Sequence, residues 1–205
     1  GKAVLDEVLL QYSYQTFTLG IGRRHPPETL PKYFANPIAL FKDSQVENSY
    51  EAISLRTEYI SDTTIGITHI TKMMPGSRSN SDYGIIGEYT NTAGIAVNPI
   101  YLEGKFVKIA DLALTGGKDV NGNQVKTPGM SKLTLVNRSL PDTTFQLWDY
   151  YVYDFVNFLF LQSDHTMKHD EFTATVKLQY LREDGIGEKY VGDVDASMWG
   201  AMLLM

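Results

Sequence analysis

The length, composition and charge of the chain exclude several classes of protein. It has 205 residues, of which 43% are hydrophobic and 20% charged, and a formal net charge of -6 at pH 7. These values predict a single globular domain over residues 1–205 and exclude a disordered chain. Because the chain has no cysteine, disulfides, thiolate catalysis and cysteine-ligated metal centres are excluded as well.

The distribution of charged and apolar residues bears on the kinds of partner to expect. No run of Lys or Arg exceeds two residues, so we expect no nucleic-acid binding and no attraction to an anionic membrane. No segment approaches the ~18 consecutive apolar residues of a membrane-spanning helix. The N-terminus lacks the basic-then-apolar pattern of a secretory signal, which a processed chain would have lost, so the compartment stays open.

The first part of the chain predicts strands separated by loops. Residues 8–19 are rich in Tyr, Thr, Phe and Leu, which predicts a strand that ends at Gly20-Ile21-Gly22. Alternation of period two predicts two further strands, 51–59 and 65–71, joined as a hairpin by the polar residues 61–64. Exposed loops or arms are expected at about 20–37, 75–84 and 115–130, the last with Asn121-Gly122 in a type I′ turn at its tip.

Apolar residues at spacings of three and four predict one amphipathic helix at about 142–161. Asp142 is a good N-cap because its carboxylate can accept hydrogen bonds from the first helical turn. The apolar stripe of this helix would comprise Phe145, Trp148, Val152, Phe155 and Leu159. We expect this stripe to pack against a sheet.

Strict alternation from residue 171 to residue 181 predicts another strand. Its inward side chains would be Phe172, Ala174, Val176, Leu178 and Tyr180. Residues 132–136 also predict a strand, and the apolar residues 198–205 would pack on the domain or meet a neighbour. These elements predict a mainly β (α+β) fold, a single antiparallel β-sandwich or barrel domain with one amphipathic helix packed on it.

The candidate metal ligands are His165 and His169, which lie four residues apart beside Asp164 and Asp170. On a helix this spacing would place both imidazoles on one face. The segment is short and precedes a strand directly, so a solvated connection is the stronger interpretation. A third ligand would have to come from elsewhere in the chain, from His25 or His69.

No other motif predicts catalysis or a cofactor. Residues 119–123 are rich in oxygen ligands, but Met130 occupies the position where a calcium loop needs a carboxylate. Gly20 and Gly22 follow a strand without the third glycine and the helix that dinucleotide binding requires. We therefore expect no enzyme, no catalytic residue, no cofactor and no metal. A catalytic site assembled around distant histidines is an alternative that sequence order does not exclude.

Two segments resemble contractile-phage tail-tube proteins. The run from Lys132 to Asn137 (KLTLVN), with the turn and the helix from Asp142, is similar to the strand–helix unit of that family. The run from Glu171 to Tyr180 (EFTATVKLQY) is similar to its closing strand. The resemblance implies a β-sandwich or barrel with one packed helix, assembled into stacked rings around a channel in which DNA slides past an acidic surface.

The function predicted first is therefore a structural, self-assembling protein of a phage or virus particle or tail-like tube. It would act through homo-oligomeric β-sheet contacts, with copies of itself and other structural proteins as partners and no membrane contact, and would be located in the virion. The candidate oligomer contacts are Asn121, Gly122, Trp199, Leu203 and Leu204. The alternative is a monomeric β-sandwich or barrel that binds a ligand, a carbohydrate or a protein partner.

Overall fold

The computed structural model describes residues 7–24, 49–74, 106–114, 117–170 and 172–205. The strands are β1 (Val8–Tyr14), β2 (Phe17–Arg24), β3 (Ser49–Thr57), β4 (Thr63–Met74), β5 (Val107–Lys108), β6 (Met130–Asn137), β7 (Thr143–Val152), β8 (Val156–His169), β9 (Phe172–Gly185) and β10 (Asp195–Leu204). One short helix, α2 (Ile109–Ala113), follows β5. Within these residues no helix has the length and apolarity needed to cross a membrane.

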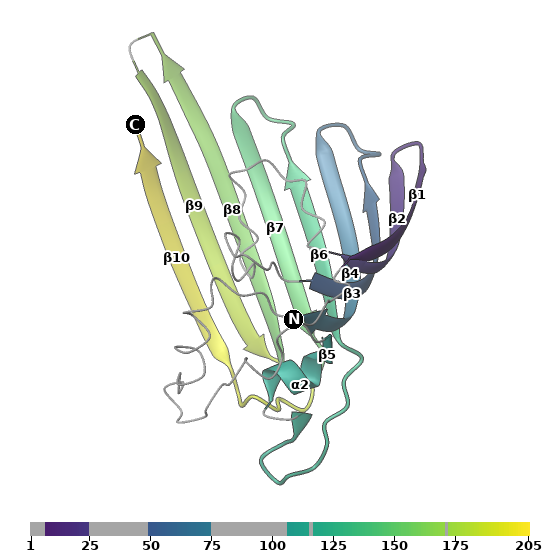
Figure 1. Cartoon of the computed structure of the whole chain (residues 1–205). Coiled ribbons are helices and arrows are strands. Elements are labelled where there is room, and N and C mark those ends of the chain that lie inside the picture. Colours follow the sequence, from purple (N-terminus) through teal and green to yellow (C-terminus); the bar gives the residue numbers. More distant parts are fainter. Residues whose placement is uncertain (1–6, 25–48, 75–105, 115–116, 171) are drawn as a thin grey trace, which may run out of the picture. The chain divides into compact units, whose positions relative to one another are not determined.

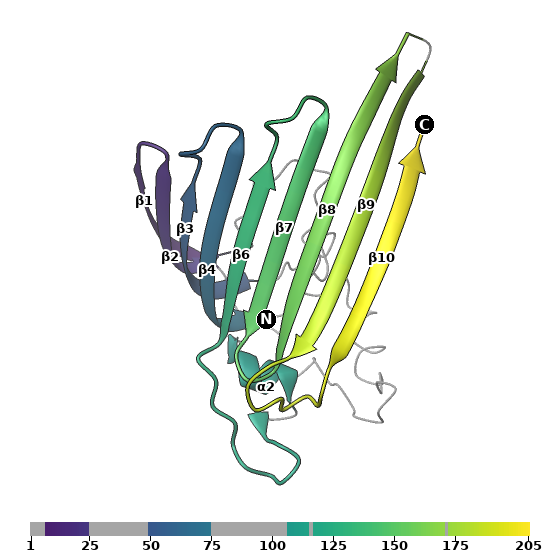
Figure 2. The ribbon, with the colours of Figure 1, turned by 180° about the vertical axis from the view of Figure 1, so that it is seen from behind.

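The described strands form one 10-stranded sheet in the order β1-β2-β3-β4-β6-β7-β8-β9-β10, with β5 paired to β4. The neighbours from β6 to β10 pair in antiparallel fashion. Figure 1 shows these long strands side by side in chain order, and Figure 2 shows the same arrangement from behind. Successive strands are therefore joined as hairpins along the sheet, which is the pattern of an antiparallel meander.

The chain divides into two compact units. The first unit comprises residues 1–10, 21–52 and 70–129. The second unit comprises residues 11–20, 53–69 and 130–205 and holds all of β6 to β10. This division does not test the prediction of one domain over residues 1–205, which stays a prediction. Of the predicted arms, residues 25–37, 75–84 and 115–116 lie outside the described part of the chain.

The predicted helix at 142–161 is wrong, because these residues form β7, a short turn and most of β8. Its supposed apolar stripe mixes residues from the two faces of the sheet with the turn residue Phe155. Large apolar side chains occur on both faces of β7, so spacings of three and four arise without a helix. Asp142 is no N-cap: it adopts a φ of 51°, and its carbonyl accepts a hydrogen bond from Thr166 N at 2.8 Å.

Two hairpin turns of the second unit share one structure. In the turn 58–62, Thr63 N donates to Ile60 O at 3.1 Å, and in the turn 138–142, Thr143 N donates to Leu140 O at 3.2 Å. Asp62, with a φ of 55°, takes the same left-handed conformation as its counterpart in the second turn. Both turns have an Asp-Thr-Thr sequence, at residues 62–64 and 142–144. The turn at residues 61–64 was predicted, but its repeat at residues 138–142 was not.

The N-terminal strand prediction needs two corrections. Residues 8–19 form two strands rather than one, because Gln15, with a φ of 51°, turns the chain between β1 and β2. The strand also does not end at the predicted glycines, since β2 continues to Arg24. Gly22 has a φ of 137°, and a Cβ there would lie 2.0 Å from Val8 O. Glycine is therefore required where β2 passes close to the backbone of β1.

Several predicted strands are confirmed. The hairpin of 51–59 and 65–71 corresponds to β3 and β4, and the strands 132–136 and 171–181 fall within β6 and β9. The predicted architecture is wrong, since the described elements are strands of one sheet and a single short helix, and residues 142–161 form no helix that could pack on that sheet. The type I′ turn is also wrong, because only Gly122 of its two central residues has a positive φ.

Candidate functional site

Cross-strand pairing in the second unit sorts its side chains onto two faces. Residues directly opposite each other on neighbouring strands share a face. One row across β6 to β10 consists of Leu135, Leu147, Leu161, Tyr180 and Trp199. The next row, on the opposite face, consists of Val136, Gln146, Gln162, Gln179 and Gly200. We call the face of the first row the apolar face and the face of the second row the polar face.

Each face keeps one main character along the strands, with exceptions: Asp149 lies on the apolar face, and Phe158, Phe160 and Leu181 lie on the polar face. The apolar face also carries Leu133, Phe145, Leu159, Phe172, Val176, Leu178, Ala201 and Leu203. The polar face also carries Lys132, Thr134, Trp148, Asp164 and Lys177. This sorting follows from the period of two in the sequence, since successive side chains of a strand point to opposite faces.

The burial of the two faces is inverted relative to a water-soluble protein. On the apolar face, Leu178 is 54% exposed and Trp199 is 77% exposed. On the polar face, Lys132, Gln146 and Asp164 are only 6%, 4% and 9% exposed. Water-soluble proteins rarely expose an apolar surface that crosses five strands. The prediction that Phe172, Val176 and Leu178 point inward is therefore wrong in its direction, although their shared face is confirmed.

Aromatic side chains lie near both ends of the strands of the second unit. At the end with the turns 58–62 and 138–142, the rings of Phe17 and Tyr59 lie 6.3 Å apart, and Phe172 stacks on His169 at 5.4 Å. Farther along the strands, Tyr180 and Trp199 lie 4.4 Å apart. Near the turn between β7 and β8, Tyr151 and Tyr153 lie 4.9 Å apart.

Charged residues follow directly beyond the aromatic pair of β9 and β10. Arg182 forms ion pairs with Asp184 at 2.5 Å and with Asp195 at 2.9 Å. Arg182 and Asp184 follow Tyr180 on β9, and Asp195 precedes Trp199 on β10. All three side chains lie on the apolar face. The apolar surface is thus bounded by a belt of aromatic rings and then by ion pairs.

The polar face carries a connected set of amide and charged groups. Gln179 Nε2 donates to Gln162 Oε1 at 2.8 Å, and Gln162 Nε2 donates to both carboxylate oxygens of Asp164, at 3.0 and 2.8 Å. Lys177 Nζ lies 3.8 Å from Asp164 Oδ1. These contacts link β8 to β9 and fix the direction of the Gln162 and Gln179 carboxamides.

The amide of Gln146 is oriented by a neighbouring ring on the same strand. Trp148 Nε1 donates to Gln146 Oε1 at 3.2 Å. Because the indole nitrogen can only donate, the atom that faces it is the amide oxygen, and the NH2 group points elsewhere. Gln146 Nε2 is buried and has no hydrogen-bond partner in the described part of the chain. The Lys132 ammonium lies 5.3 Å from the centre of the Trp148 ring.

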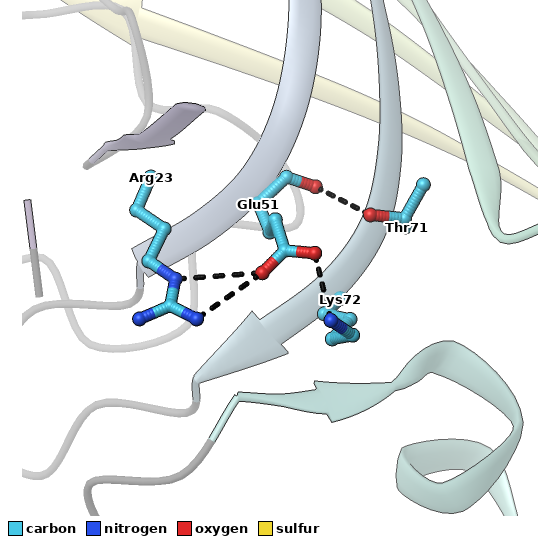
Figure 3. A network of polar contacts seen from close by, with 4 residues as sticks. All are labelled: Arg23, Glu51, Thr71 and Lys72. Carbon is cyan, nitrogen blue, oxygen red and sulfur yellow. Dashed lines mark hydrogen bonds and ion pairs between the residues drawn. The ribbon is translucent and has the colours of Figure 1, made fainter. Parts of the chain in front are cut away.

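A second polar network lies in the first unit (Figure 3). Glu51 accepts from Arg23 Nε and Nη2, each at 3.4 Å, and from Lys72 Nζ at 2.8 Å. The hydroxyl of Thr71 donates to the Glu51 carbonyl at 3.1 Å. The side chains come from β2, β3 and β4, so the network ties three strands together. All three charged groups are between 29% and 39% exposed, which makes this a partly solvated ion-pair network.

The candidate oligomer contacts are divided between the two units. Asn121 and Gly122 lie in a loop of the first unit, whereas Trp199, Leu203 and Leu204 are exposed on β10 of the second. Asp119 closes the loop by accepting from Asn121 N at 2.9 Å and Asn123 N at 2.8 Å. Hydrogen bonds from the backbone of Asn123, which have the largest effect, and from its side chain lower the pKa of the Asp119 carboxyl. Oligomer contact by these residues stays a prediction.

The candidate metal ligands His165 and His169 both lie on strand β8 and not on a helix. Four residues of a strand separate His165 from His169, which is about 13 Å. His165 Nδ1 lies 2.8 Å from Thr143 Oγ1, and His169 stacks on Phe172. No group of three or more His, Asp or Glu side chains suited to a metal occurs among the described residues.

Comparison with known proteins identifies the fold. No protein-family model matches the chain, and no curated protein matches it significantly. Among solved structures, OccAB4 of Acinetobacter baumannii is similar, with a TM-score of 0.62 and 18% identity over 94% of this chain and 39% of that one. OccK8 (OprE) of Pseudomonas aeruginosa has a TM-score of 0.65 and 10% identity, over 95% of this chain and 45% of that one.

OpdK of Pseudomonas aeruginosa, solved with vanillate, has a TM-score of 0.62 and 10% identity, over 95% of this chain and 42% of that one. A further structure of OpdK, with a TM-score of 0.57, is described as that of an outer membrane protein. The chain therefore spans about two fifths of the length of these structures, between 39% and 45%. At these identities the likeness shows the fold alone.

These likenesses overturn the resemblance to phage tail-tube proteins, because the matching structures are of Occ and Opd proteins. The prediction of a virion protein whose partners are phage structural proteins is wrong for the same reason. The prediction of no membrane contact is also wrong, since the shared fold is that of an outer membrane protein. The alternative prediction, a ligand-binding module, came closer to the fold of these structures, but it did not include a membrane location.

Proposed function

We propose that this chain forms part of an outer-membrane β-barrel porin that admits small polar solutes. The observation that carries the proposal is the inverted burial of the second unit, in which Leu178 and Trp199 of the apolar face are exposed and Lys132, Gln146 and Asp164 of the polar face are buried. In a transmembrane barrel the apolar side of each strand contacts lipid, and the polar side lines the lumen. The fold shared with OpdK, described as an outer membrane protein, supports the same assignment.

The size and borders of the apolar face support a membrane location. From Phe172 to Tyr180 the apolar stretch of β9, at about 3.3 Å per residue and a tilt of about 40°, spans about 20 Å. This approaches the apolar band of about 25 Å found in outer-membrane barrels. Aromatic pairs such as Tyr180–Trp199 and Phe17–Tyr59 would then lie in the two lipid–water interfaces.

The connections between strands support one orientation. The turns 58–62 and 138–142 are short. At the other end of the strands the turn 153–155 is also short, but residues 25–48 connect β2 to β3 and residues 75–129 connect β4 to β6. Outer-membrane barrels have short periplasmic turns and longer extracellular loops. We therefore assign the end with the short turns to the periplasm.

The two tryptophans give a direct test, because Trp148 is on the polar face and Trp199 on the apolar face. In vesicles, the Trp148→Phe variant retains only Trp199, whose fluorescence brominated acyl chains should quench. The Trp199→Phe variant retains only Trp148, which is fully buried and should not be quenched. Quenching of Trp199 by aqueous iodide, and not by brominated lipid, would rule out the lipid-facing assignment.

Channel activity requires a second measurement. The protein reconstituted in a planar bilayer should produce stepwise ion conductance, because a polar-lined barrel encloses water. Heat-denatured protein is the control for leaks caused by disordered insertion. A lipid-quenched Trp199 without any conductance would keep the membrane location and reject the channel.

A further inference from the structure

We infer that the row Gln146, Gln162 and Gln179 on the polar face binds an uncharged, hydroxyl-rich solute of sugar type. The inference rests on the proposed function, since it names the class of solute that the lumen would select. The three glutamines are direct cross-strand partners on β7, β8 and β9. At about 4.8 Å between strands, the row is about 10 Å long, which suits a monosaccharide or disaccharide.

One end of the row offers an unused donor. Gln146 is 4% exposed, and its Nε2 has no hydrogen-bond partner among the described residues. Its orientation is fixed because Trp148 Nε1 donates to Gln146 Oε1. A buried donor without an acceptor destabilises the protein, so a ligand oxygen that accepts from Gln146 Nε2 would be favoured.

The other end of the row is open and offers an acceptor. Gln179 is exposed, and its Nε2 donates to Gln162 Oε1. The Oε1 atom of Gln179 takes no part in that bond. The next residue of the row is Gly200, where a Cβ would lie 3.2 Å from Gln179 Oε1. Glycine at this position therefore leaves space beside the Gln179 carboxamide.

Donors and acceptors in one row favour hydroxyl groups over carboxylates. A hydroxyl both donates and accepts, whereas an ionised carboxylate only accepts and cannot pair with Gln179 Oε1. Asp164 and Lys177, beside the row, lie 3.8 Å apart and have opposite signs, so their fields partly cancel there. Lys132 is a third charge on this face, with its ammonium 5.3 Å from the centre of the Trp148 ring. Amide groups without net charge select for hydrogen bonding rather than for ionic charge.

The test uses the Trp199→Phe protein, in which Trp148 is the single tryptophan and reports on the Gln146 amide. Titration with maltose should shift the Trp148 emission in a saturable way. Maltobionate, the carboxylate of matching size, should bind more weakly. Adding Gln146→Leu or, at the exposed end, Gln179→Leu should weaken maltose binding by about three- to tenfold, as expected for the loss of one hydrogen bond.

Thr175→Val, on the same face but outside the row, is the control and should leave maltose binding unchanged. An unshifted Trp148 emission at saturating maltose, or tighter binding of maltobionate, would overturn the inference. Maltose should also reduce single-channel current in a planar bilayer. Conductance with no maltose response rejects the sugar site alone, whereas a maltose-shifted emission without conductance rejects the channel and keeps the binding row.

Discussion

The apolar and polar faces of the same five strands differ in how each stabilises the protein. The apolar face carries mainly Leu, Val and aromatic side chains, several of which are exposed. The polar face is buried on β6 and β7, is exposed at Gln179 on β9, and is held by specific bonds among Gln162, Asp164, Lys177 and Gln179. The difference indicates that one face depends on its surroundings, whereas the other depends on its own hydrogen bonds.

A charge placed on each face should separate them most strongly. Val176→Arg, halfway between Phe172 and Tyr180 on the apolar face, should destabilise the membrane-inserted protein by about 2–4 kcal/mol, because a cation near the bilayer midplane is poorly solvated. The neighbouring Thr175→Arg, on the polar face, loses one hydroxyl contact with Thr166 and should cost less than about 1 kcal/mol. Urea unfolding in vesicles measures both, and equal effects of the two variants would contradict the assignment of faces.

Removal of the buried carboxylate should break the polar face. Asp164→Asn should destabilise the protein by about 1–3 kcal/mol, because Lys177 loses its partner and Gln162 loses a charged acceptor. The control is Asp193→Asn, which removes an exposed carboxylate paired with Lys189 and should cost less than about 0.5 kcal/mol. The same urea titration compares them, and a silent Asp164→Asn would mean that the face holds no structural charge network.

The ion pairs of the first unit should contribute less than those of the polar face. Glu51→Gln should destabilise the protein by about 1 kcal/mol, since both partner cations are partly solvated. Hydrogen exchange of the β3 and β4 amides should report this as faster local opening. Glu58→Gln, in the exposed pair with Arg56, is the matched control and should leave the exchange rates unchanged.

The smallest expected effect concerns pH and the loop closed by Asp119. Its pKa is lowered below 3.8 by hydrogen bonds from Asn123 and others, so the carboxylate stabilises the loop above that pH. This contribution should be lost as pH falls through the lowered pKa. As the pH is lowered through this range, protection against hydrogen exchange should therefore fall more at the Asn121 and Asn123 amides than at neighbouring amides. In Asp119→Asn this extra acid dependence should be absent.

Sequence patterns predicted the strands with one clear periodicity and failed where two patterns overlapped. The alternation from residue 171 to 181 located β9, because its apolar and polar residues keep strictly to separate faces. In β7, Phe145 lies on the apolar face but Trp148 and Val152 lie on the polar face. Large apolar groups on both faces imitate a helical spacing, and this produced the wrong helix. The Asp-Thr-Thr sequence at residues 142–144 repeats that of the hairpin turn at residues 62–64, and this repeat could have indicated that β7 begins after a hairpin turn.

The sequence by itself determined the strands in which apolar and polar residues alternate strictly, such as β9, and therefore that each of these strands has one apolar and one polar side. Only the tertiary structure decided which face is buried. Period-two alternation is the same whether the apolar side meets a protein core or a lipid bilayer. The row of Gln146, Gln162 and Gln179 also depended on tertiary structure, because cross-strand register brings together residues that lie far apart along the chain.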